Sequence, residues 1–590
     1  MQIRRERIAG RLVAVAVVGS VLTGLVSTVG AGVKSESKSI DDFSTGQIAA
    51  RLAWRPMEGS KEVSVARVDG KQALRLACNF RGTRIERASW DRKVALDLTG
   101  RKGVQFLYRS EGVSSVGYFS IYFHSGAGWY KAGFGAPGSP GWGLVKILKK
   151  DAGVEGSPGG WGKIDTIRIS AWRGGNTDSE FQIAELAAFG SGGRIAIIRC
   201  DSATAKAPAE AKSVQRYANV VAGLLDQAGL DYTMLSDADV SPASLKRMQL
   251  AILPYNPVVP EKVSKTLADY MGAGGKLIAC YSFRGKLAAP VGIRMGGHVR
   301  ETRKGYFASI RPSAEGRRLE GLPDVTRQAS WNIRSASAIE GKSRVAAWWY
   351  TSDGKSTGQA AIVLSDNCAF VTHVLLSDDL AGKQRLLLAI AGRLVPAIWR
   401  DAASGALGRT GKFEPYQSYE AARKGIAALA AKGGAADASL KRAEKLHKKA
   451  VGLLIARKYA ASVATSADVR RALIDAHCLA QRPVPGEQRG FWCHSAFGVK
   501  GMTWDQAIET LADNGFNAIL PNMLWGGAAY YRSDVLPVSP EVAKRGDQIA
   551  LCLAACRKYG VACHVWKVNY NMGWATPRSF SDKVKAAGRT

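Results

Sequence analysis

Residues 489–522, RGFWCHSAFGVKGMTWDQAIETLADNGFNAILPN, alternate predicted strand and helix in the carboxy-terminal part of this chain. Residues 491–494 predict a strand, and Thr503-Trp504-Asp505-Gln506 is a capping box that opens a helix. Gly515 ends that helix, and residues 517–522 predict a second strand. The stretch therefore predicts a β-α-β unit.

A second unit of the same kind follows directly. Residues 547–559 predict a helix that Gly560 ends, and residues 562–567 predict a third strand. Two consecutive right-handed β-α-β units with short connections begin either a doubly wound sheet or a (β/α)₈ barrel. No phosphate-binding glycine motif follows the first strand, which disfavours a nucleotide-binding fold.

Four short motifs in this segment suggest a family. They are Arg489-Gly490-Phe491-Trp492, Asn514-Gly515-Phe516-Asn517, the loop 529–533 with Leu536-Pro537, and His564-Val565-Trp566 with Asn569-Tyr570. In order and spacing they resemble the glycosyl hydrolase-like 10 family of bacterial glycosidases. The resemblance implies that residues 489–590 are the first three βα units of a (β/α)₈ barrel, truncated before the later strands that carry the catalytic acids, so that this chain is inactive. It also implies a polysaccharide substrate, but Asn522-Met523 and Lys567-Val568 depart from the family and leave the sugar open.

Barrels of this kind place the site at the carboxyl ends of the strands. The substrate-binding candidates there are His494, Asn522, Trp525, Trp566, Asn569 and Tyr570. The tryptophans could stack on a sugar ring, and the amide side chains could form hydrogen bonds with its hydroxyls. His494 could either contact the sugar or pack inside the barrel. No catalytic residue is assigned, because the two carboxyl groups that glycoside hydrolysis requires are not recognisable in this segment.

Residues 41–190 predict a β-sandwich of the jelly-roll type, since alternating runs such as 104–108 and 164–170 are separated by glycine-rich turns. Asp42-Phe43 and the run 161–169 are similar to galactose-binding-like modules of carbohydrate-active enzymes. A glycan-binding surface needs exposed aromatic rings. Each aromatic residue of this segment could instead be buried in the sandwich core. The platform candidates are Trp129, Tyr130, Trp142, Trp161 and Trp172.

Residues 194–396 alternate predicted strands with predicted helices, which indicates a parallel, flavodoxin-like α/β domain. The run 274–280 resembles glutamine-amidotransferase-like domains, including the trimerisation domain of certain β-galactosidases. Cys280 and His373 could act as nucleophile and base. The elbow glycines and the orienting acid are missing, so we expect an inactive domain that supports homo-oligomerisation.

Residues 397–481 are rich in alanine, lysine, arginine and leucine, and their spacing predicts a helical hairpin. Gly433-Gly434 is a predicted break, and Pro483-Val484-Pro485-Gly486 is a predicted linker. The basic residues between 441 and 449 are expected to form a solvated face.

The amino terminus predicts the compartment. Arginines precede an apolar run, and Val29-Gly30-Ala31 ends it, which is the layout of a signal peptide over residues 1–31. We therefore expect a secreted, periplasmic or cell-envelope protein, with an uncleaved membrane anchor as the alternative.

The chain has 590 residues, 82 lysines and arginines against 49 aspartates and glutamates, and a formal net charge of +33. This length predicts several domains, and the charge favours acidic partners such as anionic polysaccharide. Export and the scattered basic residues argue against nucleic acid. A non-catalytic glycan-binding or envelope protein is the alternative function.

Nine cysteines are too few and too dispersed to build a disulfide scaffold. Cys552, Cys556 and Cys563, with His564, have spacings that suggest metal ligands, but CxxC pairs are absent and small thiols are common in cores. We expect core packing there, with no metal and no cofactor.

Overall fold

The protein is described by a computed structural model that covers residues 37–57, 59–136, 141–283, 287–482, 484–569, 572–573 and 576–589. It divides into two compact units, Met1–Ala480 and Gln481–Thr590. The predicted signal peptide or anchor and Tyr570 lie outside the described residues. Within the described part of the chain, no helix combines the length and the apolar character needed to cross a membrane.

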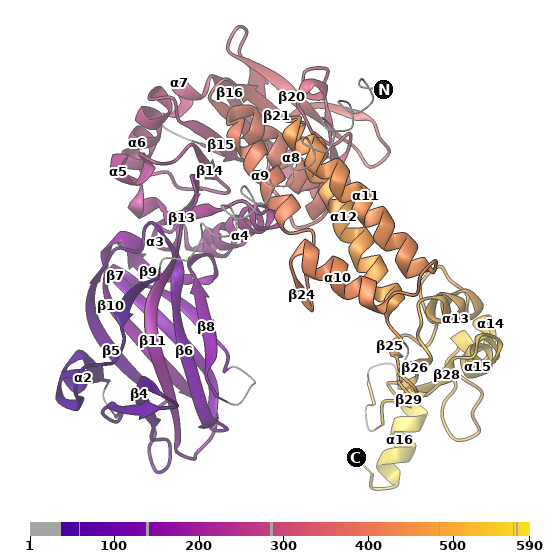
Figure 1. Ribbon diagram of the computed structural model, residues 1–590. Coiled ribbons are helices and arrows are strands. Elements are labelled where there is room, and N and C mark those ends of the chain that lie inside the picture. The colour runs from indigo at the N-terminus through magenta and orange to yellow at the C-terminus, as the bar shows by residue number, and fades with distance from the viewer. Residues whose placement is uncertain are drawn as a thin grey trace, which may run out of the picture. The chain divides into compact units, whose positions relative to one another are not determined.

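Two antiparallel sheets form a sandwich at the start of the first unit (Figure 1). One sheet has the order β3-β4-β11-β6-β8 with β1 beside β11: β1 (Lys38–Asp41), β3 (Ser64–Val68), β4 (Lys71–Cys78), β6 (Arg101–Gly112), β8 (Gly143–Leu148) and β11 (Ser179–Ser191). The other has the order β2-β5-β10-β7-β9: β2 (Trp54–Pro56), β5 (Arg87–Leu96), β7 (Val116–Phe134), β9 (Gly153–Pro158) and β10 (Ile164–Arg173). The short helix α2 (Gln47–Ala53) was not expected there.

Alternation of side chains along the strands builds the sandwich core. In β10, Ile167, Ile169 and Ala171 are fully buried, whereas Arg168 and Trp172, on the opposite side of the strand, are only partly buried. The apolar side chains of both sheets meet in one core, as a packed sandwich requires.

A nine-stranded mixed sheet follows. Five parallel strands come first in the order β13 (Tyr232–Ser236), β12 (Ile195–Arg199), β14 (Leu250–Leu253), β15 (Lys276–Cys280) and β22 (Cys368–Val371). Antiparallel strands extend it in the order β21 (Ser356–Ser365), β20 (Ser343–Tyr350), β17 (Phe307–Pro312) and β18 (Thr326–Ser330). Strands β16 (Ile293–Arg300) and β19 (Asn332–Ala338) form a separate ribbon.

Helices cover both faces of this sheet, because its parallel strands are apolar on both sides. Helices α4 (Ala211–Ala228) and α8 (Leu380–Leu394) pack on one face, and α5 (Pro242–Leu245) and α6 (Glu261–Gly272) pack on the other. The alternation expected over residues 195–280 is present, whereas the antiparallel extension was not foreseen.

Four helices complete the first unit: α9 (Ala397–Gly408), α10 (Tyr419–Leu429), α11 (Ala435–Ile455) and α12 (Tyr459–Ala480). Helices α11 and α12 lie side by side (Figure 1) and share a small core with α10. The hairpin of β23 (Lys412–Phe413) and β24 (Tyr416–Gln417) joins α9 to α10.

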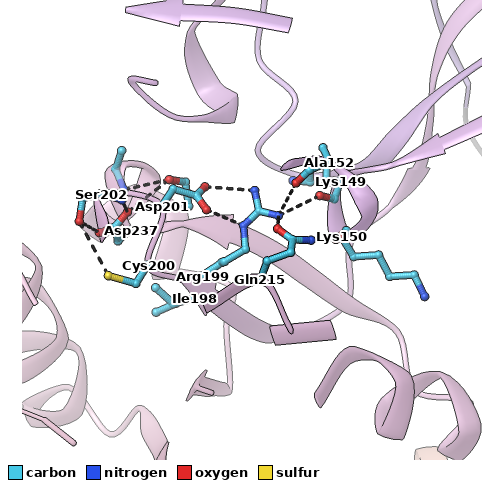
Figure 2. A network of polar contacts seen from close by, with 12 residues as sticks. Lys149, Lys150, Ala152, Ile198, Arg199, Cys200, Asp201, Ser202, Gln215 and Asp237 are labelled. Atoms are coloured by element: carbon cyan, nitrogen blue, oxygen red, sulfur yellow. Dashed lines mark hydrogen bonds and ion pairs between the residues drawn. The ribbon is translucent and has the colours of Figure 1, made fainter. Parts of the chain in front are cut away.

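A buried polar network joins the sandwich to the nine-stranded sheet (Figure 2). Arg199 at the end of β12 pairs with Asp201, with 2.5 Å between Nε and Oδ1, and both side chains are almost fully buried. Its Nη1 also donates to the carbonyl of Ala152 at 2.8 Å and to Oε1 of Gln215 at 2.7 Å. Each polar group of the pair thus has a hydrogen-bond partner, as buried charges require.

A second link lies beside the first. Asp239 accepts a hydrogen bond from the backbone N–H of Trp161 at 3.0 Å. Lys149 is buried nearby and donates to the carbonyls of Leu98 and Thr99, each at 2.9 Å. Burial lowers the pKa of Lys149 to about 8.

The second unit contains a small parallel sheet in which β26 (Ala518–Trp525) lies between β25 (Gly490–Cys493) and β28 (Ala562–Cys563). Helices α13 (Trp504–Asp513) and α15 (Gln548–Tyr559) follow β25 and β26, and the remaining elements are β27 (Ala528–Ala529), α14 (Glu541–Arg545), β29 (Trp566–Lys567) and α16 (Arg578–Ala586). The capping box of Thr503 and Gln506 is confirmed. The third predicted strand is split into β28 and β29, and membership of a barrel stays a prediction.

Candidate functional site

One face of the five-stranded sheet points away from the sandwich core and carries aromatic and basic side chains. Strand β10 runs between β5 and β7, so its outward residues pair on both sides. Three outward rows cross the sheet in this register: Arg87–Trp172–Tyr118, Ser89–Ser170–Ser120 and Asp91–Arg168–Tyr122. We call these three rows, together with Trp129, the aromatic face.

The first row is an ordered stack. The rings of Tyr118 and Trp172 are nearly parallel, with centroids 5.2 Å apart, and the Arg87 guanidinium lies 4.7 Å from the Trp172 centroid. Trp172 Nε1 donates to Ser120 at 2.8 Å. Tyr118 is 49% exposed and is therefore the ring of this row most open to a ligand.

The third row is held by an ion pair. Arg168 donates to both carboxylate oxygens of Asp91, at 2.6 and 2.8 Å. Its guanidinium also lies 4.5 Å from the Trp129 centroid, within the range of a cation–π interaction. Trp129 contacts Tyr122 edge-to-face, with centroids 6.0 Å apart. Between the two aromatic rows lie only serines, which are fully buried; the Ser89 hydroxyl donates to that of Ser170, and Ser120 accepts from Trp172.

The structure separates the five predicted platform residues. Trp129 and Trp172 belong to the aromatic face. Tyr130 and Trp161 stack on each other in the core with centroids 3.9 Å apart and are 0% and 1% exposed, so their prediction as glycan contacts is wrong. Tyr130 lies on the inward side of β7, and Trp161 lies in the short 3₁₀ turn Trp161–Lys163 before β10; the sandwich core packs around both rings. Trp142 is half-buried before β8 and donates to the carbonyl of Val68 at 3.4 Å.

Three predicted residues of the carboxy-terminal unit come together. A pocket of about 370 Å³ is lined by His494, Ser495, Ala496, Phe497, Asn522, Trp525 and Tyr530. Trp525 is 49% exposed, and Asn522 is buried with its Oδ1 accepting from the Leu524 N–H at 3.3 Å. Strand β26 supplies both residues at its carboxyl end, where a parallel sheet presents its ligand site. The pocket offers an aromatic ring beside amide, hydroxyl and imidazole groups.

The other predicted residues of this unit lie around that pocket. Trp566 is not part of its lining, although its ring lies 5.4 Å from that of His494, edge-to-face. Its Nε1 donates to the carbonyl of Cys493 at 3.3 Å. Asn569 is exposed, and Tyr570 is outside the described residues.

A further pocket, of about 190 Å³, opens where the parallel strands of the nine-stranded sheet end. It is lined by Glu210, Ser213, Tyr217, Tyr255, Tyr281, Trp331, Asn332, His373 and Val374. Tyr281 directly follows β15 and has a φ of 67°. A strained turn of positive φ is therefore present at this strand end although the elbow glycines are missing, and it carries a tyrosine one residue after Cys280.

Cys280 and His373 are not arranged as a nucleophile and its base. Cys280 lies in the core, where burial raises the pKa of its thiol to about 12. His373 is also buried, which lowers its pKa to about 4, and its Nδ1 lies 3.0 Å from the carbonyl of Val374. The His373 ring contacts Tyr281, with centroids 5.6 Å apart.

Sequence reasoning missed Tyr118, Tyr122 and Arg168. The signal was the alternation of Tyr118, Ser120, Tyr122 and His124 along one predicted strand, which marks a polar, aromatic outer face. The residues of the smaller pocket come from several distant segments and share no local pattern.

No protein-family model matches the chain, and no curated protein matches it. Among solved structures, it is similar to a family 11 carbohydrate-binding module from Clostridium thermocellum, with 15% identity, a TM-score of 0.22, and coverage of 26% of this chain and 96% of the module. It is also similar to a β-galactosidase from Rahnella sp. R3, with 16% identity, a TM-score of 0.27, and coverage of 34% and 31%. A ThuA-like protein from Bacteroides uniformis shows 10% identity, a TM-score of 0.27, and coverage of 35% and 92%.

The solved structures named above are a carbohydrate-binding module, a glycosidase and a ThuA-like protein, all at low identity and over part of the chain. Its membership of the glycosyl hydrolase-like 10 family stays a prediction.

Proposed function

We propose that this protein binds polysaccharide through the aromatic face of its sandwich. The observation that carries the proposal is the register of β5, β10 and β7, which places aromatic rings and guanidinium groups on one outward surface. A sugar presents flat C–H faces and a rim of hydroxyls. Aromatic rings cover the former, and arginine side chains bond the latter.

The basic side chains near the aromatic face indicate which kind of polysaccharide should bind most tightly. Arg87 and Lys131 lie close to the Trp172 ring, at 4.7 and 5.7 Å from its centroid. The chain as a whole carries a net charge of +33. We therefore propose that acidic polysaccharides, with carboxylate or sulfate groups, bind more tightly than neutral ones.

The test is affinity electrophoresis of the full chain in gels containing a neutral, a uronic or a sulfated polysaccharide. We expect retardation that is strongest in the acidic gels and weakens with salt. Tyr118→Ala should reduce the association constant about fivefold, since a sugar-stacking ring contributes on the order of 1 kcal/mol. Trp142→Phe changes an aromatic residue outside the aromatic face and should leave the retardation unchanged. Equal retardation of the two variants would contradict the proposal.

A second candidate is glycoside-hydrolase-like activity of an exported protein, favoured by the pocket that joins His494, Asn522 and Trp525. These groups could bind a sugar beside the ends of the parallel strands. The acid pair that hydrolysis needs is not among the described lining residues. Measuring new reducing ends on the same polysaccharides, with Trp525→Ala as the comparison, distinguishes hydrolysis from binding alone.

A further inference from the structure

Three cysteine sulfurs meet in the core of the carboxy-terminal unit. Cys552 and Cys556 lie one turn apart on α15, and Cys563 ends β28. The Sγ atom of Cys552 is 3.9 Å from that of Cys556 and 3.9 Å from that of Cys563, and all three lie within 4.8 Å of one another. A disulfide would require about 2.0 Å, so these are three free thiols in contact. We call them the thiol cluster.

Local structure explains how the thiols meet. Residues four apart on a helix share one face, which places Cys552 and Cys556 side by side. Gly560 then adopts the left-handed conformation, with a φ of 69°, and its N–H bonds the carbonyl of Cys556. This helix end turns the chain back, so that β28 brings Cys563 over the same face of α15.

Two of the three sulfur separations match those of a metal–thiolate site. With metal–sulfur bonds of about 2.3 Å, sulfurs lie about 3.8 Å apart in a tetrahedral site and about 4.0 Å apart in a planar trigonal one. The Cys552–Cys556 and Cys552–Cys563 separations are both 3.9 Å, and the Sγ atoms of Cys556 and Cys563 lie within 4.8 Å of each other. A cation at the centre of the thiol cluster could therefore be bound with at most a small adjustment of the Cys556 and Cys563 side chains.

The number of ligands limits which metal ion the thiol cluster could bind. In the part of the chain that the structure describes, no fourth cysteine, histidine or carboxylate joins the thiol cluster. The side chains that share its core include Ile508, Ile519 and Val561. Structural zinc takes four protein ligands, whereas soft thiolates also select monovalent copper. We propose that the thiol cluster is a three-coordinate thiolate site for a soft d¹⁰ cation, Cu(I).

A cation could reach the thiol cluster from the solvent at Cys563. Cys552 and Cys556 are 0% and 2% exposed, whereas Cys563 is half-buried and precedes the exposed His564. A cation would reach the site at Cys563 and displace thiol protons to the solvent as each copper–sulfur bond forms. The sequence indicated only core packing for these thiols, and the proposal adds a ligand role to that packing.

The test uses the full chain, reduced and kept free of oxygen, with Cu(I) supplied as its coloured bicinchoninate complex. We expect the protein to withdraw one Cu(I) per chain. Cys563→Ser should lower the affinity by more than the roughly 10–100-fold that loss of an outer-shell partner costs. The control is Cys478→Ser, an exposed cysteine of α12, which should bind as the unmodified chain does.

A second measurement does not depend on any variant. X-ray absorption of the copper complex should show three sulfur neighbours at about 2.3 Å, close to the bond length of zinc thiolates. Failure to withdraw Cu(I), equal binding by a folded Cys563→Ser variant, a shell containing nitrogen or oxygen, or displacement of Cu(I) by equimolar Zn(II) would each overturn the assignment.

Discussion

At the scale of single residues, the Arg199–Asp201 pair is the most deeply buried ion pair described, with side chains 1% and 2% exposed. Replacing Arg199 by alanine leaves the Asp201 carboxylate buried without its partner. We expect the free energy of unfolding to fall by about 3–5 kcal/mol, measured by urea denaturation. The double variant Arg199→Met with Asp201→Leu should lose much less, because no charge is left unpaired. A double variant as unstable as Arg199→Ala would contradict this account.

His373 predicts a dependence of stability on pH. Its pKa is about 4 in the folded protein, because the ring is buried, and about 6.5 when the chain is unfolded. Between these values the unfolded chain binds a proton that the folded protein does not. Stability therefore falls as the pH drops from 6.5 to 4, by up to about 3 kcal/mol for this group.

Substituting His373 tests that dependence. His373→Asn removes the titrating group and keeps an amide donor near the carbonyl of Val374. We expect its stability to decline less steeply than that of the unmodified chain between pH 6.5 and 4, as measured by denaturation at a series of pH values. His494→Asn, at an exposed position, is the control and should keep the original slope. Identical slopes for all three proteins would rule out the role given to His373.

At the scale of one element, the start of α13 depends on a reciprocal cap. Thr503 accepts a hydrogen bond from the Gln506 N–H at 3.2 Å, and Gln506 accepts one from the Thr503 N–H at 3.0 Å. Thr503→Ala removes one of the two bonds and should cost about 1 kcal/mol. Faster hydrogen exchange at the first turn of α13 would report this loss, and Thr503→Ser should restore protection. Exchange that is unchanged in Thr503→Ala would show that the cap is not needed.

At the scale of the whole molecule, the sandwich extends beyond both ends of the segment predicted for it. The sequence placed it at residues 41–190, but β1 begins at Lys38 and pairs along β11, which ends at Ser191. Asp41 in β1 accepts from Trp54 Nε1 at 2.9 Å and pairs with Arg92. A fragment of residues 41–190 loses most of this strand.

We expect both fragments to fold, with residues 38–191 more stable than residues 41–190. Each kcal/mol that β1 contributes should raise the melting temperature by about 2–4 °C for a domain of this size. Differential scanning calorimetry of the two fragments measures the difference. Equal melting temperatures would mean that β1 adds nothing to the sandwich.

Local sequence patterns were enough to predict most of the individual strands and helices. Alternation predicted the sandwich strands, strand–helix alternation predicted the parallel part of the mixed sheet, and the capping box and Gly515 predicted α13. These signals come from residues close together in the chain, namely the periodicity of apolar side chains, helix caps and turns. They can therefore be recognised without knowing the fold.

Contacts between distant segments set which side chains share a surface. Trp172 and Trp161 looked alike in sequence, but strand pairing placed the first beside Tyr118, whereas the second lies in the turn before β10 and stacks on Tyr130 in the core. The contact of Cys563 with Cys552 likewise depends on β28 folding back on α15. Register and packing are set by contacts between distant segments, and one residue of register exchanges the two faces of a strand. For that reason, the aromatic face and the thiol cluster could be recognised only in the folded chain.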